Sequence, residues 1–221
     1  MILITSISNQ IGLAAARALL AKGVRVRGVT PDFDRGKSIA DAGGEVIEGD
    51  LSNELVRAKV LADVSAVILV TKNGPTQVQQ EILISEDAEK FGISHLVKIS
   101  SIDARHDATA PIARGHYEIE LFLSGLQFAV TIIRANFLMQ HLLKSANTIQ
   151  SLDTFSLPLG ESKIAMINAD DIGEIAANVV VSNPHISKSY SITGSKSLDC
   201  QQIAEEMSRT FGRKIRYVQN S

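Results

Sequence analysis

The chain opens with Met1-Ile-Leu-Ile-Thr-Ser-Ile-Ser-Asn-Gln-Ile-Gly12, and this stretch decides the fold. Its first residues form a short apolar run that predicts a buried strand. From Ile11 to Leu19 apolar residues recur at helical spacing, which predicts an amphipathic helix that ends at Lys22-Gly23. A strand, a tight turn and a helix start in this order are typical of the first unit of a parallel α/β sheet.

The same alternation continues along most of the chain. Apolar runs predict strands, and the amphipathic stretches between them predict helices, so the pattern indicates a doubly wound parallel sheet with right-handed crossovers. The expected strands span residues 2–5, 24–29, 45–48, 66–70, 94–99 and 128–133. The expected helices span residues 11–22, 35–42, 53–61, 77–91 and 112–123.

From about residue 135 the rhythm loosens, and we expect a second, smaller α+β part over residues 136–221 that packs on the first part, residues 1–135. Its polar stretch 148–163, with Pro158 and Gly160, predicts a loop. The expected helices of this part span 136–147, 170–181 and 198–211, and the expected strands span 164–167, 188–193 and 214–218.

The composition excludes several classes of protein. A formal net charge of −2 gives no basic field, so we expect no nucleic-acid partner. No apolar run approaches the ~20 residues that cross a bilayer, and the N-terminus lacks a signal peptide's positive region; we expect no membrane partner and a cytoplasmic location. Cys200 is the only cysteine, which favours a reducing compartment. No cluster of side chains has metal-ligand spacing, so we expect no metal.

The turn after the first strand is where such a fold binds ligands, because parallel sheets bind at the carboxyl ends of their strands. Free amides at the next helix N-terminus favour a phosphate. The glycine pattern of a dinucleotide-binding turn, Gly-x-x-Gly-x-x-Gly, stands here as Ser6-x-x-Asn9-x-x-Gly12. Gly12 keeps a close helix–strand contact, and Asn9 tolerates the left-handed region better than most residues. The alternative is a helix start capped by Ser8, without a ligand.

Further segments match a known family in order and spacing over nearly the whole chain. They are Thr5 to Gly12, Gly44-Glu-Val-Ile-Glu-Gly-Asp-Leu51, His95-Leu-Val-Lys-Ile-Ser-Ser101 and Thr131-Ile-Ile-Arg-Ala-Asn-Phe137. In these segments the chain resembles the NmrA-like group of atypical short-chain dehydrogenase/reductases. The resemblance implies an NAD(P)-binding Rossmann domain over residues 1–135 and a small substrate-side subdomain over residues 136–221. After Tyr217 the family normally continues, so the pocket is expected to be open, closed by another subunit, or incomplete because the sequence is truncated.

The resemblance also implies a cofactor site. In the family the first loop binds the pyrophosphate of NAD(P). Pro31 stands where the family usually has an arginine for the 2′-phosphate, and Arg35 or Lys37 lies close enough to replace it. Asp32 and Asp34 favour NAD instead; we expect NADP, with NAD as the alternative. The residues matched to the pyrophosphate loop are Ser6, Ser8, Asn9, Gln10, Ile11 and Gly12.

Two other pairs of residues match cofactor positions of the family. Asp50 and Leu51 match positions that flank the adenine. Thr71 and Lys72 end the fourth strand, where residues of the family line the binding site of the nicotinamide ribose.

The catalytic positions depart from the Tyr-x-x-x-Lys of typical short-chain dehydrogenases, since Leu121 follows Tyr117 at that spacing. The family's alternative resembles Ala113-Arg-Gly-His116-x-x-x-Glu120, with His116 at the lysine-equivalent position and Ile112 at the tyrosine's. A register slip would place Arg114 there instead. Tyr117 is the alternative proton donor.

The resemblance places a small-molecule substrate above the nicotinamide. Ser100 and Ser101 are expected to bind it or to cap the loop that follows them. Asn136, Phe137 and Met139 follow the sixth strand and are expected to wall it.

Three functions are consistent with these residues. The first is an NAD(P)H-dependent reductase of a small quinone-like or conjugated molecule, in which positioning supplies most of the catalysis. The second is a non-catalytic NAD(P)-binding redox sensor that signals through a protein partner; the missing glycines and the absent Tyr-x-x-x-Lys favour it. The third is a fold that has lost its nucleotide site. A homodimer or a regulatory protein is the expected macromolecular partner.

Overall fold

The computed structural model describes residues 1–219, and the chain divides into two compact units. The first contains Met1–Ala135 and Asp170–Ile192; the second contains Asn136–Ala169 and the chain from Thr193 onward. The sequence predicted one boundary, with a continuous second part from residue 136. The structure instead returns residues 170–192 to the first unit, because β8 (Ser189–Ile192) pairs with β6 (Ala129–Ala135) and extends its sheet.

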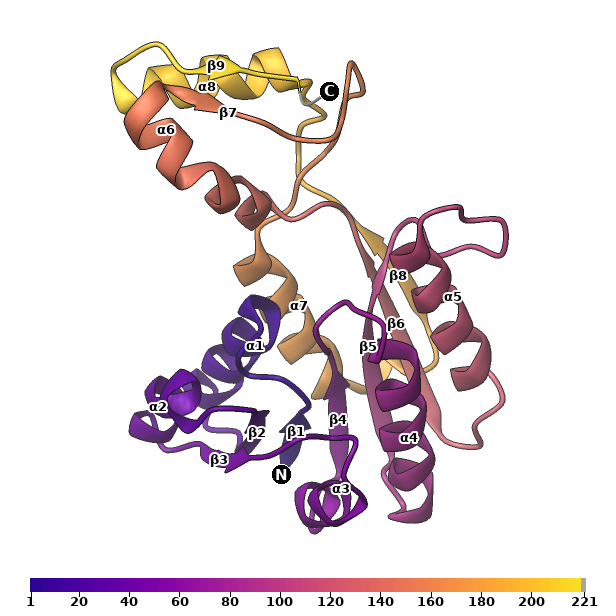
Figure 1. The fold of residues 1–221 in the computed structure, drawn as a ribbon. Coiled ribbons are helices and arrows are strands. Elements are labelled where there is room, and N and C mark those ends of the chain that lie inside the picture. Colours follow the sequence, from indigo (N-terminus) through magenta and orange to yellow (C-terminus); the bar gives the residue numbers. More distant parts are fainter. Residues whose placement is uncertain (220–221) are drawn as a thin grey trace. The chain divides into compact units, whose positions relative to one another are not determined.

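The first unit is built on a seven-stranded sheet in the order β3-β2-β1-β4-β5-β6-β8 (Figure 1). Every neighbouring pair is parallel. The strand order reverses between β1 and β4, which makes their carboxyl ends the topological switch point. The predicted Rossmann-type sheet is therefore confirmed. The remaining strands are β1 (Ile2–Ile4), β2 (Val26–Thr30), β3 (Glu45–Glu48), β4 (Ala66–Leu69) and β5 (His95–Ser101).

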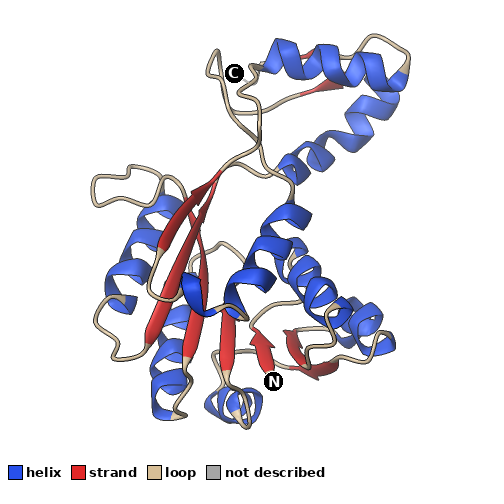
Figure 2. Ribbon diagram, turned by 180° about the vertical axis from the view of Figure 1, so that it is seen from behind, coloured by secondary structure: helices blue, strands red, loops and turns tan. Residues whose placement is uncertain are grey.

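Helices cover both faces of this sheet (Figures 1 and 2). The first group, on one face, is α1 (Gln10–Ala21), α2 (Phe33–Asp41) and α7 (Ala169–Val180). The second group, on the other face, is α3 (Glu54–Leu61), α4 (Gln77–Lys90) and α5 (Pro111–Leu123). The short 3-10 helix η2 (Asn183–His185) precedes β8.

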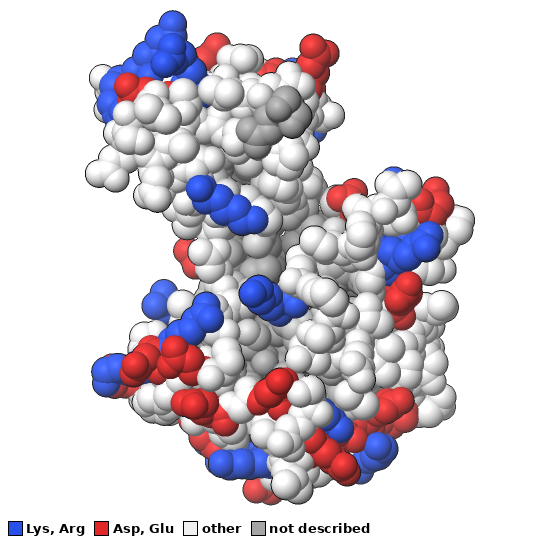
Figure 3. All heavy atoms as spheres, viewed as in Figure 1, with Lys and Arg blue, Asp and Glu red and all other residues white. Residues whose placement is uncertain are grey.

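The core of the first unit lies on both sides of the central strands. Leu3, Val67, Leu69 and Leu96 expose none of their surface, because β1, β4 and β5 have neighbours on both edges and helices on both faces. This explains why the central strands read as unbroken apolar runs. The surface of the unit carries acidic and basic side chains mixed together over α2 and α3 (Figure 3), as the small net charge of −2 leads us to expect.

The second unit has a separate core around Phe155, Met166 and Ile203. A two-stranded parallel sheet pairs β7 (Thr154–Phe155) with β9 (Arg216–Tyr217). The helical elements are the 3-10 helix η1 (Met139–Ser145), α6 (Ala146–Leu152) and α8 (Cys200–Phe211).

Two predictions for the second unit were wrong in detail. The polar stretch 148–163 was expected to be a loop, yet it contains most of α6 and all of β7. Residues 164–167 form isolated bridges, Ile164 with Leu198 and Ile167 with Leu138, rather than a strand. Short elements of this kind are stabilised by contacts with distant residues, and local periodicity does not reveal them.

No helix within residues 1–219 is long and apolar enough to cross a bilayer. Within the same residues, no three His, Cys, Asp or Glu side chains are grouped as a metal site.

Candidate functional site

The first loop, residues 5–9, is fixed by hydrogen bonds to both strands that neighbour β1. The buried Thr5 hydroxyl donates to the Val70 carbonyl at 2.7 Å and accepts from the Val70 amide at 2.9 Å. On the other side, the Ile7 amide donates to the Val29 carbonyl at 2.9 Å. The loop therefore has one defined path at the switch point, although it lacks two of the usual glycines.

Asn9 caps the helix that follows this loop. Its backbone is extended (φ −86°, ψ 141°), and its side chain accepts the Ile11 amide at 2.9 Å. Asn9 is thus the N-cap residue rather than Ser8, and it does not use the left-handed region that its type tolerates. An extended backbone is open to any residue, which explains why asparagine replaces glycine here without strain.

Gly12 is the one glycine of the pattern that the geometry requires. A Cβ at this position would lie 1.9 Å from the Ser6 carbonyl oxygen and 3.2 Å from Cγ2 of Ile4. The helix start is therefore pressed against the loop backbone. Within residues 1–219 the amides of Gln10 and Gly12 have no hydrogen-bond partner, as is usual at an uncompleted helix N-terminus. Such a helix start is suited to an anionic group.

The cationic residues near the end of β2 differ in what they contact. Arg35 reaches the first loop, where its Nη2 donates to the Ser8 carbonyl at 3.4 Å. Lys37 pairs instead with Asp41 one helical turn later, at 3.6 Å. The Asp32 carboxylate caps α2 by accepting the Asp34 amide at 3.0 Å. Of the two cations that could replace the missing arginine, the structure places Arg35 beside the loop.

The predicted adenine-flanking pair lies at the start of the segment after β3. Asp50 is exposed, and its Oδ1 accepts the Ser52 amide at 2.8 Å and the Gln80 side-chain amide at 3.2 Å. Leu51 is buried, and its carbonyl accepts Nη1 of Arg57 at 3.0 Å. The pair is held firmly, and its role towards adenine stays a prediction.

Thr71 is connected to a buried ion pair that the sequence analysis missed. Its hydroxyl donates to Oε1 of Glu81 on α4 at 2.6 Å. The other oxygen of Glu81 lies 2.5 Å from Nζ of Lys98 on β5, and both of these side chains are fully buried. Burial lowers the pKa of Lys98, and the charge of Glu81 opposes that shift. Lys72, the other predicted residue here, is exposed.

Ser100 has the same arrangement one strand further along. Its hydroxyl donates to Oε1 of Glu120 on α5 at 2.6 Å. Glu120 in turn binds Arg134 of β6, with Nε at 3.0 Å from Oε1 and Nη2 at 2.5 Å from Oε2. The hydrogen bonds to Glu120 raise the pKa of Arg134. The hydroxyl oxygen of the half-buried Ser101 accepts a hydrogen bond from the Asp103 amide at 3.2 Å. Ser101 therefore caps the loop that follows β5, which is one of the two roles expected for it.

His116 is buried inside the first unit, with 6% of its surface exposed. Its Nδ1 has no hydrogen-bond partner within the described residues. Burial, and to a smaller extent the charge of Lys98, lowers the pKa of His116 from 6.5 to about 3. The imidazole is therefore neutral near pH 7. The catalytic role of His116 stays a prediction. In such a role a neutral ring would act as a hydrogen-bonding group rather than as a cationic acid.

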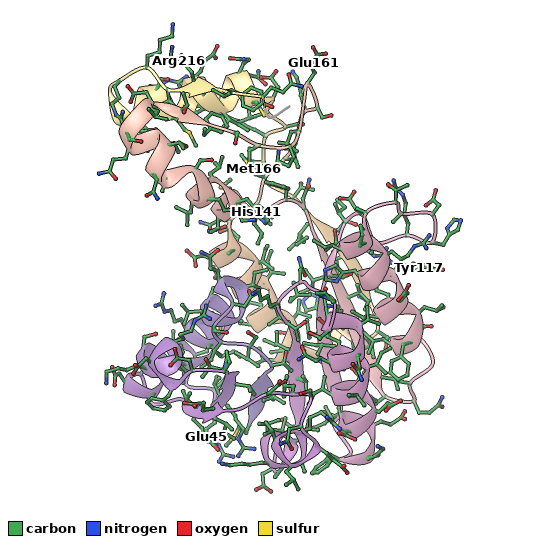
Figure 4. The ribbon with its side chains drawn as sticks, in the orientation of Figure 1. Glu45, Tyr117, His141, Glu161, Met166 and Arg216 are labelled. Atoms are coloured by element: carbon green, nitrogen blue, oxygen red, sulfur yellow. The ribbon has the colours of Figure 1, made fainter. Side chains whose placement is uncertain are left out.

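Tyr117 is half-buried on α5 (Figure 4), with its ring centroid 6.3 Å from that of His106 in the preceding loop. Ile112 and Arg114 are exposed on the same helix. They line a hollow of about 510 Å³ between α5 and the segment after β4, with Gly74, Pro75 and Val78 on the other side. Its volume is that of a small-molecule site.

The other predicted substrate residues belong to the second unit. Asn136 accepts the Phe137 amide at 2.8 Å through its own side chain. The Phe137 ring lies 4.5 Å, centroid to centroid, from the ring of His141. His141 belongs to η1 and is labelled in Figure 4. Met139 is exposed. Their contact with a substrate stays a prediction.

The chain matches the model of the NmrA-like family over residues 1–221. The NAD(P)H azoreductase of Xenophilus azovorans is 30% identical over 220 residues, which are 99% of this chain and 76% of that protein. Quinone oxidoreductase 2 of Escherichia coli is 23% identical over 222 residues, covering 98% and 77%.

Solved structures show the same fold. The NADPH-dependent quinone oxidoreductase of Escherichia coli, complexed with NADPH, has a TM-score of 0.88 at 23% identity. It covers 100% of this chain, which spans 79% of that one. The triphenylmethane reductase of Citrobacter sp., complexed with NADP(H), has a TM-score of 0.86 at 18% identity, with coverage of 100% and 79%.

Proposed function

Because this chain belongs to the NmrA-like family, we propose that it is an NAD(P)H-dependent reductase of small quinone-like or conjugated molecules. The observation that carries the proposal is the start of α1. Gly12 lets the helix approach the loop backbone, and the amides of Gln10 and Gly12 stay unpaired within the described residues. Arg35 adds a positive charge beside Ser8. These residues fit the pyrophosphate of a dinucleotide.

The cofactor we propose is NADPH, with NADH as the alternative. Arg35 is the residue that would hold a 2′-phosphate, since a guanidinium binds phosphate oxygens through several N–H groups. The relatives support this choice, because solved structures of the same fold are described as complexes with NADPH or NADP(H). When bound, the dihydronicotinamide supplies a hydride.

The substrate class follows from the proton donors that this chain offers. Ser100 and Thr71 donate their hydroxyl hydrogens to carboxylates, and His116 is neutral near pH 7. A site without a strong acid is suited to acceptors that take a hydride readily, such as quinones and extended dyes, rather than to simple ketones. Relatives named as an azoreductase and as quinone and triphenylmethane reductases agree with this.

The test is a binding titration followed by a turnover assay. Fluorescence titration of the purified chain with NADPH and NADH should show binding, tighter for NADPH. Oxidation of NADPH should then be measured with a naphthoquinone, an azo dye and a triphenylmethane dye, and with a simple ketone as control. Turnover of the conjugated acceptors alone is the expected result. Binding of neither cofactor, or binding without turnover of any acceptor, would contradict the proposal.

A second candidate, a redox sensor, is favoured by the same lack of a free acid. In that case NADPH binds without turnover, and it changes the association of the chain with itself or with a regulatory protein. Size-exclusion chromatography with and without NADP+ and NADPH separates the two functions, since a sensor changes its assembly with the cofactor. For either function we propose a cytoplasmic location, which the single buried thiol of Cys200 supports.

A further inference from the structure

The hollow of about 510 Å³ lies between the starts of α4 and α5, which pack side by side on one face of the sheet (Figure 1). Pro75 and Val78 form its wall on one side, and Pro111 and Ile112 form the wall on the other. These four side chains are apolar, and the volume is that of a site for a small molecule. Among the described residues that line the hollow, only Ile112 and Arg114 were matched to positions of the family's site.

The closed end of the hollow carries one buried polar side chain, Gln77, which is 3% exposed. Its Nε2 donates to Oε1 of Glu81 at 3.2 Å, and Glu81 forms an ion pair with Lys98. A carboxylate accepts hydrogen bonds and donates none, so this contact fixes which end of the amide is the oxygen. Within residues 1–219 the amide oxygen has no hydrogen-bond partner, and it still meets the open space of the hollow. The closed end therefore offers one acceptor to a ligand.

Two helices begin at this hollow, and neither start has a side-chain cap. In α4 the amides of Val78 and Gln79 have no hydrogen-bond partner within the described residues. In α5 the same holds, over the same part of the chain, for the amides of Ile112 and Ala113. Unpaired amides give each helix start a partial positive charge of about half an elementary charge. Both starts therefore favour an anionic group nearby.

A full positive charge stands at the mouth of the hollow. Arg114 and Glu118 lie one helical turn apart on α5, and both are exposed. Within residues 1–219 neither the guanidinium nor the carboxylate has a hydrogen bond or an ion pair. Of the described residues that line the hollow, only Glu118 is acidic. Arg114 together with the two helix starts outweighs this one negative charge, so the mouth is suited to an anion.

We propose that this hollow binds an aromatic acid that carries a hydroxyl or amino group at the end opposite its acid group. The acid group lies at the mouth, beside Arg114 and the two helix starts. The rings fill the space between the apolar walls, and the hydroxyl or amino group donates to the Gln77 amide oxygen at the closed end. The site does not depend on the proposed reductase function, because it needs no bound dinucleotide.

The first experiment compares three ligands on the purified chain. The probe is 6-hydroxy-2-naphthoate, a fluorescent two-ring acid with a hydroxyl at its far end. The ligand 2-naphthoate lacks the donor, and the ligand 2-naphthol lacks the acid group. In fluorescence titrations each of these two should bind about 5- to 10-fold more weakly than the probe, because each lacks one polar contact. A saturating concentration of NADP+ should leave the probe bound.

The second experiment removes one contact at a time. Arg114→Gln should weaken the probe and 2-naphthoate about 5- to 10-fold and leave 2-naphthol within about twofold. Arg17→Gln is the matched control, because Arg17 is exposed on α1, on the opposite face of the sheet, and it should change none of the three affinities. Gln77→Met should lower the affinity for the probe to that for 2-naphthoate, whereas Gln79→Met, at an exposed position of α4, should not. Thermal unfolding confirms that each variant is folded.

The third experiment locates the ligand. Gly74 lines the hollow, and a Cβ added there would meet no atom within 4 Å. Gly74→Trp should therefore fill the hollow and weaken all three ligands at least about tenfold, while Gly74→Ala should change them less than about twofold.

Three results would each overturn the proposal. They are displacement of the probe by NADP+, equal affinity of the three ligands, and folded Arg114→Gln and Gln77→Met variants that bind the probe as the wild type does. A chain that binds the probe as expected but binds no NADP+ would support the site in the hollow and refute the proposed reductase function alone.

Discussion

The ammonium of Lys98 lies 2.5 Å from a carboxylate oxygen of Glu81, and neither side chain exposes any surface. This pair connects the middle of β5 to α4, and through Glu81 it also holds Thr71. Buried pairs of this kind are expensive to break, because the partner that remains is a charge without compensation. The position of Thr71, at the carboxyl end of β4, therefore depends on Lys98 through Glu81.

Replacing Lys98 with methionine should lower the free energy of unfolding by about 3–5 kcal/mol, since Glu81 is left buried and unpaired. Urea denaturation measures this. Lys90→Met is the control, because Lys90 pairs with Asp87 at 2.9 Å while 70% of its side chain is exposed. It should leave the midpoint of urea denaturation almost unchanged, because solvent screens an exposed ion pair. Equal effects of the two substitutions would show that burial of the Lys98 pair carries no energetic weight.

His116 should make the protein sensitive to acid. Its pKa is about 3 in the folded chain and 6.5 when free, so the unfolded state alone takes up a proton as the pH falls below 6.5. Below pH 6.5 this group lowers the free energy of unfolding by about 1.4 kcal/mol for each unit by which the pH falls. Between pH 7 and pH 5 the wild type should lose about 2 kcal/mol more than His116→Gln. His106→Gln, on an exposed loop, should leave the slope unchanged; an unaltered slope in His116→Gln would contradict the linkage.

Gly12→Ala should damage both stability and cofactor binding. Its Cβ would lie 1.9 Å from the Ser6 carbonyl oxygen, so the helix start has to move away from the loop. We expect a loss of about 1–3 kcal/mol in unfolding free energy and at least about tenfold weaker NADP+ binding. In Gly125→Ala the nearest atom would be 3.5 Å away, and both quantities should stay within error. Tight NADP+ binding by Gly12→Ala would show that the start of α1 is not part of the cofactor site.

Arg35→Gln should weaken NADPH about 10- to 100-fold and change NADH little, since a charge-assisted bond to the 2′-phosphate is lost. Lys37→Gln is the matched variant, because Lys37 faces Asp41 rather than the loop. It should shift neither affinity more than twofold. If Lys37→Gln rather than Arg35→Gln reverses the cofactor preference, the assignment of the phosphate is wrong.

Restoring the family's glycine at position 9 should bring no gain. Asn9 has an extended backbone and caps α1, so Asn9→Gly loses the bond to the Ile11 amide and relieves no strain. Its cost should be a few tenths of a kcal/mol, against about 1 kcal/mol for Asn9→Ala. Both are read from chemical denaturation, and NADP+ affinity is measured in parallel. Tighter NADP+ binding by Asn9→Gly would show that the native loop is an impaired one.

Most of the fold was predictable because it depends on local periodicity. The alternation of apolar runs and amphipathic stretches led to the parallel sheet, whose seven strands in the first unit confirm it. The second unit was less predictable. Its α6 and the two-residue strand β7 lie in a stretch of polar composition, and β7 exists only because it pairs with β9 about sixty residues away.

The sequence by itself determined the fold class, the first loop and the family, because short-range patterns of burial and spacing are written in consecutive residues. It also singled out Ser100, His116 and Thr71 as residues of interest. Only the tertiary structure decided their state. Glu81 and Lys98 are 17 positions apart and look like surface charges in the chain, yet the packing of α4 on β5 buries both and joins them. The low pKa of His116 follows mainly from its own burial and in smaller part from the charge of Lys98, since electrostatic energies depend on distances and solvent exclusion.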